Sequence, residues 1–155
     1  MIVEKKLESM GIVLPDISQL EPVGLYEPAV IVGNLIFTSG TGPDVKDMEK
    51  FIGKVGKELT LEQGQTAAMQ CAINLLADLK YELGDLDRVE RIVRLIGHVN
   101  SAPGFNLQPK VINGASELFI KLWGTKGKHA RAALAVNELW QDIPVECYLI
   151  AQLKE

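Results

Sequence analysis

The chain has 155 residues, of which 47% are hydrophobic and 23% are charged. This length and balance are typical of one folded domain with its own hydrophobic core, so we expect a single domain over residues 1–155. The formal net charge is −4, which provides no overall positive field to attract nucleic-acid phosphates. Because of this charge we expect no nucleic-acid partner. No run of about 18 apolar residues occurs, so we also expect no membrane span.

The N-terminal residues and the cysteines bear on the compartment. The opening sequence MIVEKKLESMG has no long apolar core, so we expect no signal peptide and a cytoplasmic location. Cys71 and Cys147 lie in apolar patterns with no metal-ligand spacing around them, and we interpret both as core residues. His98 and His129 stand far apart, and we expect neither to be a catalytic base or a metal ligand. No metal site is predicted.

The first third of the chain predicts a short helix and a hairpin. Residues 3–10 can form an amphipathic helix that ends at Gly11. Two β-rich runs follow, Ala29–Val32 and Leu35–Ser39, and the Gly33-Asn34 pair between them predicts a tight hairpin. Small residues after the second strand expose backbone groups and the Ser39 hydroxyl. By its spacing alone this stretch is simply a turn.

The middle of the chain predicts two helices on either side of a strand. Thr60 to Gln63 has the Thr-x-x-Gln form of a capping box, and apolar residues then recur at helical spacing up to Gly84. Leu86–Val99 is strand-like, and the apolar residues from Val111 to Leu122 predict a second helix. Asn113 falls off the apolar stripe of that helix, so it is free to face a partner or a ligand.

The last two strand-like runs each hold one charged residue in apolar sequence, Arg131 in the first and Glu146 in the second. The short polar link between them predicts an antiparallel hairpin, with Pro144 tolerated at the start of the returning strand. Glu146 would then lie opposite about residue 135, roughly 13 Å along the strand from Arg131. One small ligand could hardly touch both within a single hairpin. A site shared between neighbouring subunits would remove this difficulty.

The predicted elements run strand, strand, helix, strand, helix, strand, strand. This order is typical of an α+β fold in which two long helices cover one face of a mostly antiparallel sheet. Taken without further information, Arg131 is a strand-edge residue in a surface ion pair, worth about 0 to 1 kcal/mol, and Glu146 is a solvated strand residue.

Five short motifs stand in the order found in a known family: Gly24-Leu25-Tyr26, GNLIFTSG at 33–40, LGDL at 83–86, ARAA at 130–133 and Pro144-Val145-Glu146. From about Pro22 to Ala151 the chain resembles the YjgF/YER057c/UK114 family. The same family is called the Rid family of reactive-imine deaminases and, under an older label, endoribonuclease L-PSP. The resemblance implies a chorismate-mutase-like fold, a homotrimer and ligand pockets between subunits.

The resemblance also implies the residues of the site. Arg131 matches the carboxylate-binding arginine of the family, and Glu146 matches the glutamate associated with the attacking water. Five further residues match positions that line the pocket through side chains or backbone groups: Tyr26, Ser39, Gly40, Asn113 and Ala133.

These residue types suit the hydrolysis of a 2-imino acid. An arginine can hold the carboxylate by two parallel charge-assisted hydrogen bonds, which a lysine could not reproduce. A glutamate can orient one water toward the imine carbon and take its proton. The products would be a 2-oxo acid and ammonia, without a metal or an organic cofactor.

Several positions depart from the shorter members of the family that the chain resembles. Ala133 replaces a frequent cysteine, Trp140 a proline, His129 a proline or alanine, and Cys147 an isoleucine or methionine. An extended N-terminus and a longer loop at 101–110 place the chain in a longer branch. The missing cysteine argues against a thiol-based activity but not against imine hydrolysis.

Three functions stay open from the sequence. The first is hydrolysis of reactive enamines or imines through Arg131 and Glu146. The second is a binding module for a small carboxylate, with the same arginine but no turnover. The third is ribonuclease activity, against which stand the acidic charge and the lack of paired histidines or metal-binding carboxylates.

Overall fold

The structure is a computed structural model that describes residues 1–18, 24–43 and 52–155. Its helices and strands follow the predicted order, and the fold is α+β. The elements are α1 (Ile2–Ser9), β1 (Ala29–Val32), β2 (Leu35–Thr38), α2 (Leu61–Leu83), β3 (Val89–Asn100), α3 (Gln108–Trp123), β4 (Ala130–Val136) and β5 (Val145–Leu153). Among the described residues, no helix is long and apolar enough to cross a membrane.

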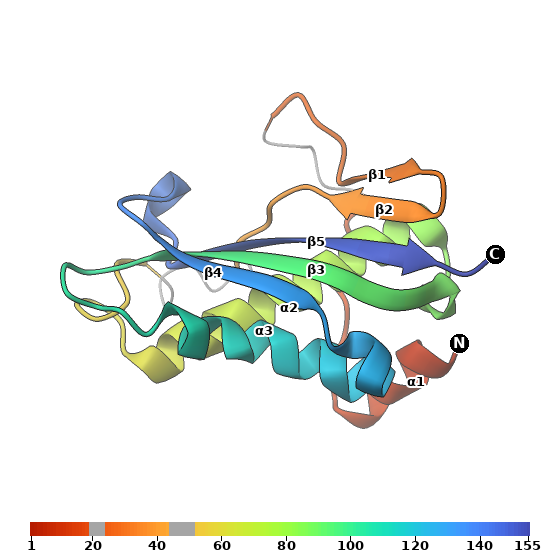
Figure 1. The fold of residues 1–155 in the computed structure, drawn as a ribbon, viewed down its shortest axis with the longest axis horizontal. Coiled ribbons are helices and arrows are strands. Elements are labelled where there is room, and N and C mark those ends of the chain that lie inside the picture. The colour runs from red at the N-terminus through yellow and green to blue at the C-terminus, as the bar shows by residue number, and fades with distance from the viewer. Residues whose placement is uncertain (19–23, 44–51) are drawn as a thin grey trace.

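The strands form one sheet in the order β1-β2-β5-β3-β4. All neighbouring pairs are antiparallel except β3 and β4, which run parallel. Figure 1 shows α2 and α3 side by side on one face of this sheet, with α1 at one end. No described helix lies on the opposite face, which we call the open face.

The predicted hairpin of the last two strands is wrong, because β3 lies between β4 and β5. The chain leaves β3 through α3 and returns beside it as the parallel strand β4, and the link after β4 then crosses the end of β3. Asn100 holds this link, since its side-chain amide donates to Asp142 Oδ1 at 3.0 Å and to the Ile143 carbonyl at 3.2 Å. Alternation within each run predicted the strands but not their neighbours.

The strands have one face toward the helices and one toward the open side. On β5, Val145, Cys147 and Leu149 are buried, and the residues between them are only partly covered. Both cysteines are free and buried in the core, as predicted. Burial raises the pKa of the Cys71 thiol well above its ordinary value, so this thiol stays protonated and suits packing rather than chemistry.

The helix ends confirm the local signals of the sequence. The Thr60 hydroxyl accepts the Gln63 backbone N–H at 3.1 Å, and the Gln63 side chain accepts the Thr60 N–H at 2.9 Å, which completes the capping box of α2. Gly84 ends the helix with a φ of +73°, a left-handed conformation that glycine adopts at low cost. These contacts fix both ends of the longest helix.

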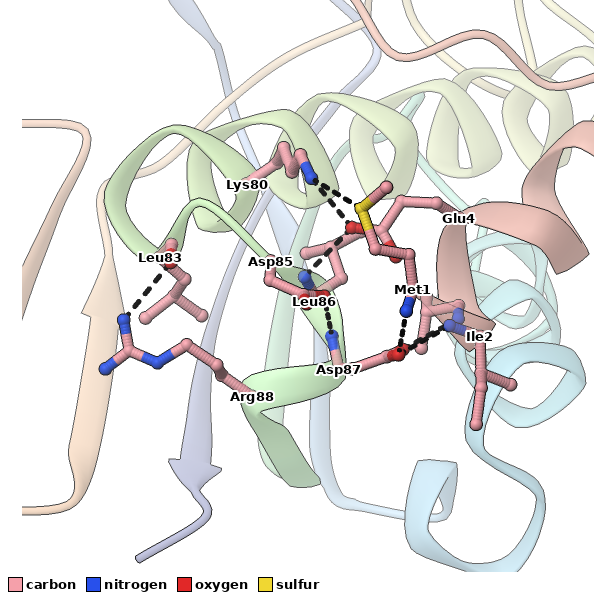
Figure 2. A network of polar contacts seen from close by, with 10 residues as sticks. Met1, Ile2, Glu4, Lys80, Leu83, Asp85, Leu86, Asp87 and Arg88 are labelled. Atoms are coloured by element: carbon pink, nitrogen blue, oxygen red, sulfur yellow. Dashed lines mark hydrogen bonds and ion pairs between the residues drawn. The ribbon is translucent and has the colours of Figure 1, made fainter.

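A polar network attaches α1 to the rest of the domain (Figure 2). The Asp87 carboxylate accepts the backbone N–H groups of Ile2 at 2.5 Å and Val3 at 2.8 Å, so a residue far along the chain caps the start of α1. Glu4 accepts the Lys80 ammonium at 2.8 Å and the Leu86 N–H at 3.1 Å. Together these bonds join α1 to α2 and to the turn before β3.

Asp78 on α2 gives a prediction for the pH dependence of stability. Burial raises the pKa of its carboxyl to about 7, with a further contribution from Glu82. The folded state therefore keeps a proton that the unfolded state releases near pH 4, so this group lowers stability as pH rises from about 4 to 7. We expect Asp78→Asn to stabilise the protein by up to about 4 kcal/mol at pH 8 and by little at pH 4.

Urea unfolding of both proteins from pH 4 to pH 8 measures this difference. Tyr81→Phe is a matched control on the same helix, because Tyr81 is exposed and its substitution changes no carboxyl. An advantage of Asp78→Asn that stayed constant from pH 4 to pH 8 would contradict the raised pKa.

Candidate active site

Arg131 lies on the helix-facing side of β4 and points toward α3. Its backbone pairs with Leu95 of β3, which is buried against the helices. Three oxygen atoms of α3 accept its guanidinium hydrogens: Asn113 Oδ1 at 2.8 Å, Ser116 Oγ at 3.1 Å and the Pro109 carbonyl at 3.2 Å. The structure thus brings together Arg131 and Asn113, two residues that the sequence analysis placed in one site.

The positive charge of Arg131 is positioned but not neutralised. All three acceptors are uncharged, and no carboxylate of the described residues forms a salt bridge with this arginine. A guanidinium carries five N–H donors, so two remain for a ligand. This arrangement differs from the surface ion pair that a strand-edge arginine would otherwise form, and it suits a carboxylate.

His129, which stands just before the start of β4, extends the polar contacts of Arg131. Its Nε2 lies 3.0 Å from Ser116 Oγ, and its Nδ1 lies 2.6 Å from the Gly127 carbonyl oxygen. Burial lowers the pKa of His129, and the nearby Arg131 charge lowers it further, although the contact with Gly127 acts in the opposite direction. The ring is therefore neutral at pH 7. We call Arg131, Asn113, Ser116 and His129 the arginine group.

Glu146 lies on the open face, near the start of β5. Glu146 pairs with His98 of β3, and the Glu146 side chain lies close to the backbone of Gly40. A Cβ atom on Gly40 would stand 2.2 Å from Glu146 Oε1, so a larger residue here would push this carboxylate out of its present position. The Ser39 hydroxyl donates to the Glu27 carbonyl at 2.6 Å, which ties the strand end to the residue after Tyr26. We call Glu146, Gly40 and Ser39 the glutamate group; Tyr26 precedes Glu27, and its side chain is 49% exposed.

The two groups lie on opposite faces of the sheet within one chain. Paired residues on neighbouring strands point to the same face, so Arg131 shares the helix side with Leu95, and Glu146 shares the open side with His98. Ala133 pairs with Gly97 and lies on the helix side, the same face as the arginine group. The predicted site residues Arg131 and Glu146 therefore do not come together around one small ligand within a single subunit.

Other hollows and clusters do not coincide with these residues. A cavity of about 450 Å³ lies between α1 and α2, lined mainly by apolar side chains such as Leu7, Ile12 and Leu14. No residue of the arginine group or the glutamate group lines it. Glu4, Asp85 and Asp87 place one oxygen each within 4.8 Å of one another, but all three carboxylates accept hydrogen bonds from the protein.

Comparison with known proteins decides the family. A family model described as "YjgF/chorismate_mutase-like, putative endoribonuclease" matches residues 4–153. The chain belongs to the YjgF family. The recognition from the five short motifs is thereby confirmed, and so is the chorismate-mutase-like α+β fold.

One relative and two solved structures resemble the chain over most of its length. Protein TCP17 of Trypanosoma cruzi is 37% identical over 97% of this chain and 94% of its own. The structure of Atu1372 from Agrobacterium tumefaciens, a protein described as of unknown function, is 36% identical over 99% of this chain and 93% of its own, with a TM-score of 0.88. The RidA protein of an Antarctic Psychrobacter is 25% identical over 86% and 92%, with a TM-score of 0.55.

The sequence analysis missed Ser116, and it set His129 aside after weighing it only as a base or a metal ligand. Ser116 follows Asn113 by three residues, a spacing that puts both on one side of a helix. That spacing was visible in the sequence. The contact with His129 was not, because it depends on the short turn Gly124–Gly127 between α3 and β4.

Proposed function

We propose that this YjgF-family protein is an enzyme that hydrolyses reactive 2-imino acids, or the enamines in equilibrium with them, to 2-oxo acids and ammonia. The observation that carries the proposal is the Arg131 guanidinium, which three uncharged oxygens of α3 hold in place. Two N–H groups remain to bind a carboxylate. We place this activity in the cytoplasm.

The active site of this proposal lies between neighbouring subunits of a homotrimer, where the arginine group of one chain meets the glutamate group of the next. The opposite faces of Arg131 and Glu146 support this arrangement. The open face also offers an apolar surface for a second copy of the chain, since Val30, Phe37 and Leu134 are 54%, 38% and 50% exposed. In a closed ring, every interface would unite one half of each kind.

The chemistry follows from the two halves. Arg131 binds the carboxylate and fixes the position of the neighbouring imine carbon. Glu146 accepts a proton from a water molecule whose oxygen bonds to that carbon, and the nitrogen takes up a proton as the C=N bond becomes single. Glu146 gives the nitrogen that proton and then carries the proton of the new hydroxyl group to the nitrogen as well. The C–N bond then breaks, ammonia leaves, a C=O bond remains, and Glu146 is again a carboxylate. Tyr26 and the backbone near Gly40 and Ala133 line the pocket.

Glu146→Gln tests the base directly. We expect it to lower imine hydrolysis by about a hundredfold or more while leaving 2-oxo acid binding nearly unchanged, because glutamine keeps the shape of the side chain but cannot accept the proton. The assay generates 2-iminopropanoate with an amino-acid oxidase and follows its decay with and without the protein. Glu138→Gln, a glutamate in the exposed link after β4, is the matched control.

The same assay separates the enzyme from a non-catalytic carboxylate-binding module, since that module would have the same arginine. If the wild-type protein binds pyruvate through Arg131 but does not accelerate imine decay, the binding module replaces the deaminase. Full activity in Glu146→Gln would retain the deaminase but remove Glu146 from its mechanism.

A further inference from the structure

The arginine group contains a continuous chain of hydrogen bonds that ends at a backbone carbonyl. Arg131 Nη1 donates to Ser116 Oγ at 3.1 Å, Ser116 Oγ lies 3.0 Å from His129 Nε2, and His129 Nδ1 lies 2.6 Å from the Gly127 oxygen. Ser116 is 8% exposed, so its hydroxyl depends on protein partners rather than on water.

The partners at each end fix the direction of every bond. A carbonyl oxygen can only accept, so Nδ1 of His129 carries the ring proton and donates it to Gly127. The neutral ring then has a bare Nε2, which accepts the Ser116 hydroxyl hydrogen. With its hydrogen committed to Nε2, the Ser116 oxygen presents lone pairs to Arg131. Each hydrogen bond is therefore donated in the same direction, from Arg131 to Ser116, from Ser116 to His129 and from His129 to the Gly127 carbonyl.

The surroundings hold His129 in this state. Phe119 packs edge-on against the ring, with 6.0 Å between ring centroids. A Cβ on Gly127 would lie 2.2 Å from the Phe119 carbonyl oxygen, so glycine is needed for the turn that brings its own carbonyl to Nδ1. Of the groups that contact the ring from α3 and from this turn, Ser116, Phe119 and the Gly127 carbonyl do not titrate. Arg131 is the charged group that acts on it.

We propose that His129 is a positioning residue for substrate binding, which acts through Ser116 to hold the Arg131 guanidinium in the orientation that receives a 2-oxo or 2-imino carboxylate. This inference rests on the proposed function of the same site and extends it to a residue outside the pocket. Without an acceptor at the Nε2 position, the Ser116 hydroxyl can turn its hydrogen toward Arg131, and a guanidinium, which has donors only, is then repelled.

Two substitutions at His129 separate its two hydrogen bonds. In His129→Asn the side-chain amide can still donate to Gly127, but no acceptor remains at the Nε2 position. In His129→Gln the amide oxygen can occupy that position and accept the Ser116 hydroxyl. We expect pyruvate affinity, measured by calorimetry at pH 7.5, to fall about fivefold in His129→Asn and to stay within about twofold in His129→Gln.

A double-mutant cycle tests whether the effect passes through Ser116. Ser116→Ala should weaken pyruvate binding about fivefold, and adding His129→Asn should weaken it no further, because the histidine acts only through the hydroxyl. The losses from Asn113→Ala and His129→Asn should instead multiply, since Asn113 contacts Arg131 independently. In the imine assay, His129→Asn should raise KM about fivefold with kcat nearly unchanged, as for a loss of uniform binding.

The outcomes distinguish this inference from the function beneath it. Suppose that the wild type binds pyruvate and Arg131→Ala does not. If His129→Asn then binds pyruvate like the wild type, or if its loss of affinity multiplies with the loss in Ser116→Ala, the positioning role is wrong and the proposed function stands. If the wild type shows no Arg131-dependent pyruvate binding, both are overturned. Thermal unfolding of each variant identifies any loss of affinity that comes from misfolding. If His129→Asn is destabilised, recovery of pyruvate affinity in His129→Gln supports the positioning role, and no recovery contradicts it.

Discussion

Arg131→Ala is expected to remove detectable pyruvate binding and to lower kcat/KM for imine hydrolysis by about a hundredfold or more. The estimate follows from two lost charge-assisted hydrogen bonds, each worth about 1.5–3 kcal/mol. Arg131→Lys should be nearly as inactive, because an ammonium cannot bond in parallel to both carboxylate oxygens while also contacting Asn113, Ser116 and the Pro109 carbonyl. Calorimetry with pyruvate and the imine-decay assay measure the two losses.

Arg94→Ala is the matched control for the loss of a positive charge from the sheet, because Arg94 lies on the neighbouring strand β3 and pairs with Ala130. This variant should bind pyruvate like the wild type. Retention of full activity by Arg131→Ala would contradict the proposed deaminase, whatever the behaviour of the control. Equal losses in the two variants would indicate a general electrostatic effect instead of a specific site.

Subunit mixing locates the two halves of the site. Arg131→Ala and Glu146→Gln proteins are each expected to be inactive, but a hybrid ring can contain an interface with an intact arginine from one variant and an intact glutamate from the other. After random exchange of subunits in equal amounts, about a quarter of the interfaces would be complete. Activity that reappears on mixing supports a site between subunits. A mixture that stays inactive, although exchange has occurred, contradicts it.

The sequence predicted those parts of the fold that local contacts determine. The ends of α2 are set by hydrogen bonds between near neighbours, at Thr60 and Gln63 and at Gly84. The hairpin of β1 and β2 likewise pairs strands that are adjacent in the sequence, joined by Gly33-Asn34. The order of β5, β3 and β4 depends on contacts far apart in the chain. Alternation cannot reveal these, since a strand looks the same whether its partner precedes it by ten residues or by fifty.

The site was predictable in residue type and only partly in arrangement. Arg131 and Asn113 do meet, at 2.8 Å. The sequence analysis expected Arg131 and Glu146 to be too far apart for one ligand, but it based this on a hairpin that does not form. In the structure the reason is different, because the two side chains lie on different faces of the sheet. The link from Arg131 through Ser116 to His129 could not be read from the sequence, since α3, a turn and β4 must first fold together.

Gly114→Ala is expected to destabilise the protein by about 3 kcal/mol. Helix propensity predicts the opposite, since replacing glycine by alanine inside a helix usually stabilises it by about 0.5–1 kcal/mol. The deciding contact is between helices: a Cβ on Gly114 would lie 2.1 Å from the Gln65 carbonyl oxygen and 2.9 Å from its carbon. Because these are backbone atoms, no side chain can rotate away, and α2 and α3 must separate.

Urea unfolding at one fixed protein concentration measures this cost, because the stability of an oligomer depends on concentration. Glu117→Ala, at an exposed position of the same helix, is the control for changes in helix propensity and should shift stability by less than about 0.5 kcal/mol. Since α3 also carries all three oxygens that hold Arg131, any folded Gly114→Ala protein should bind pyruvate more weakly than the wild type. A variant as stable as the wild type would show that the helices can part at no cost, and the rigid support for Arg131 would then have to come from β4 alone.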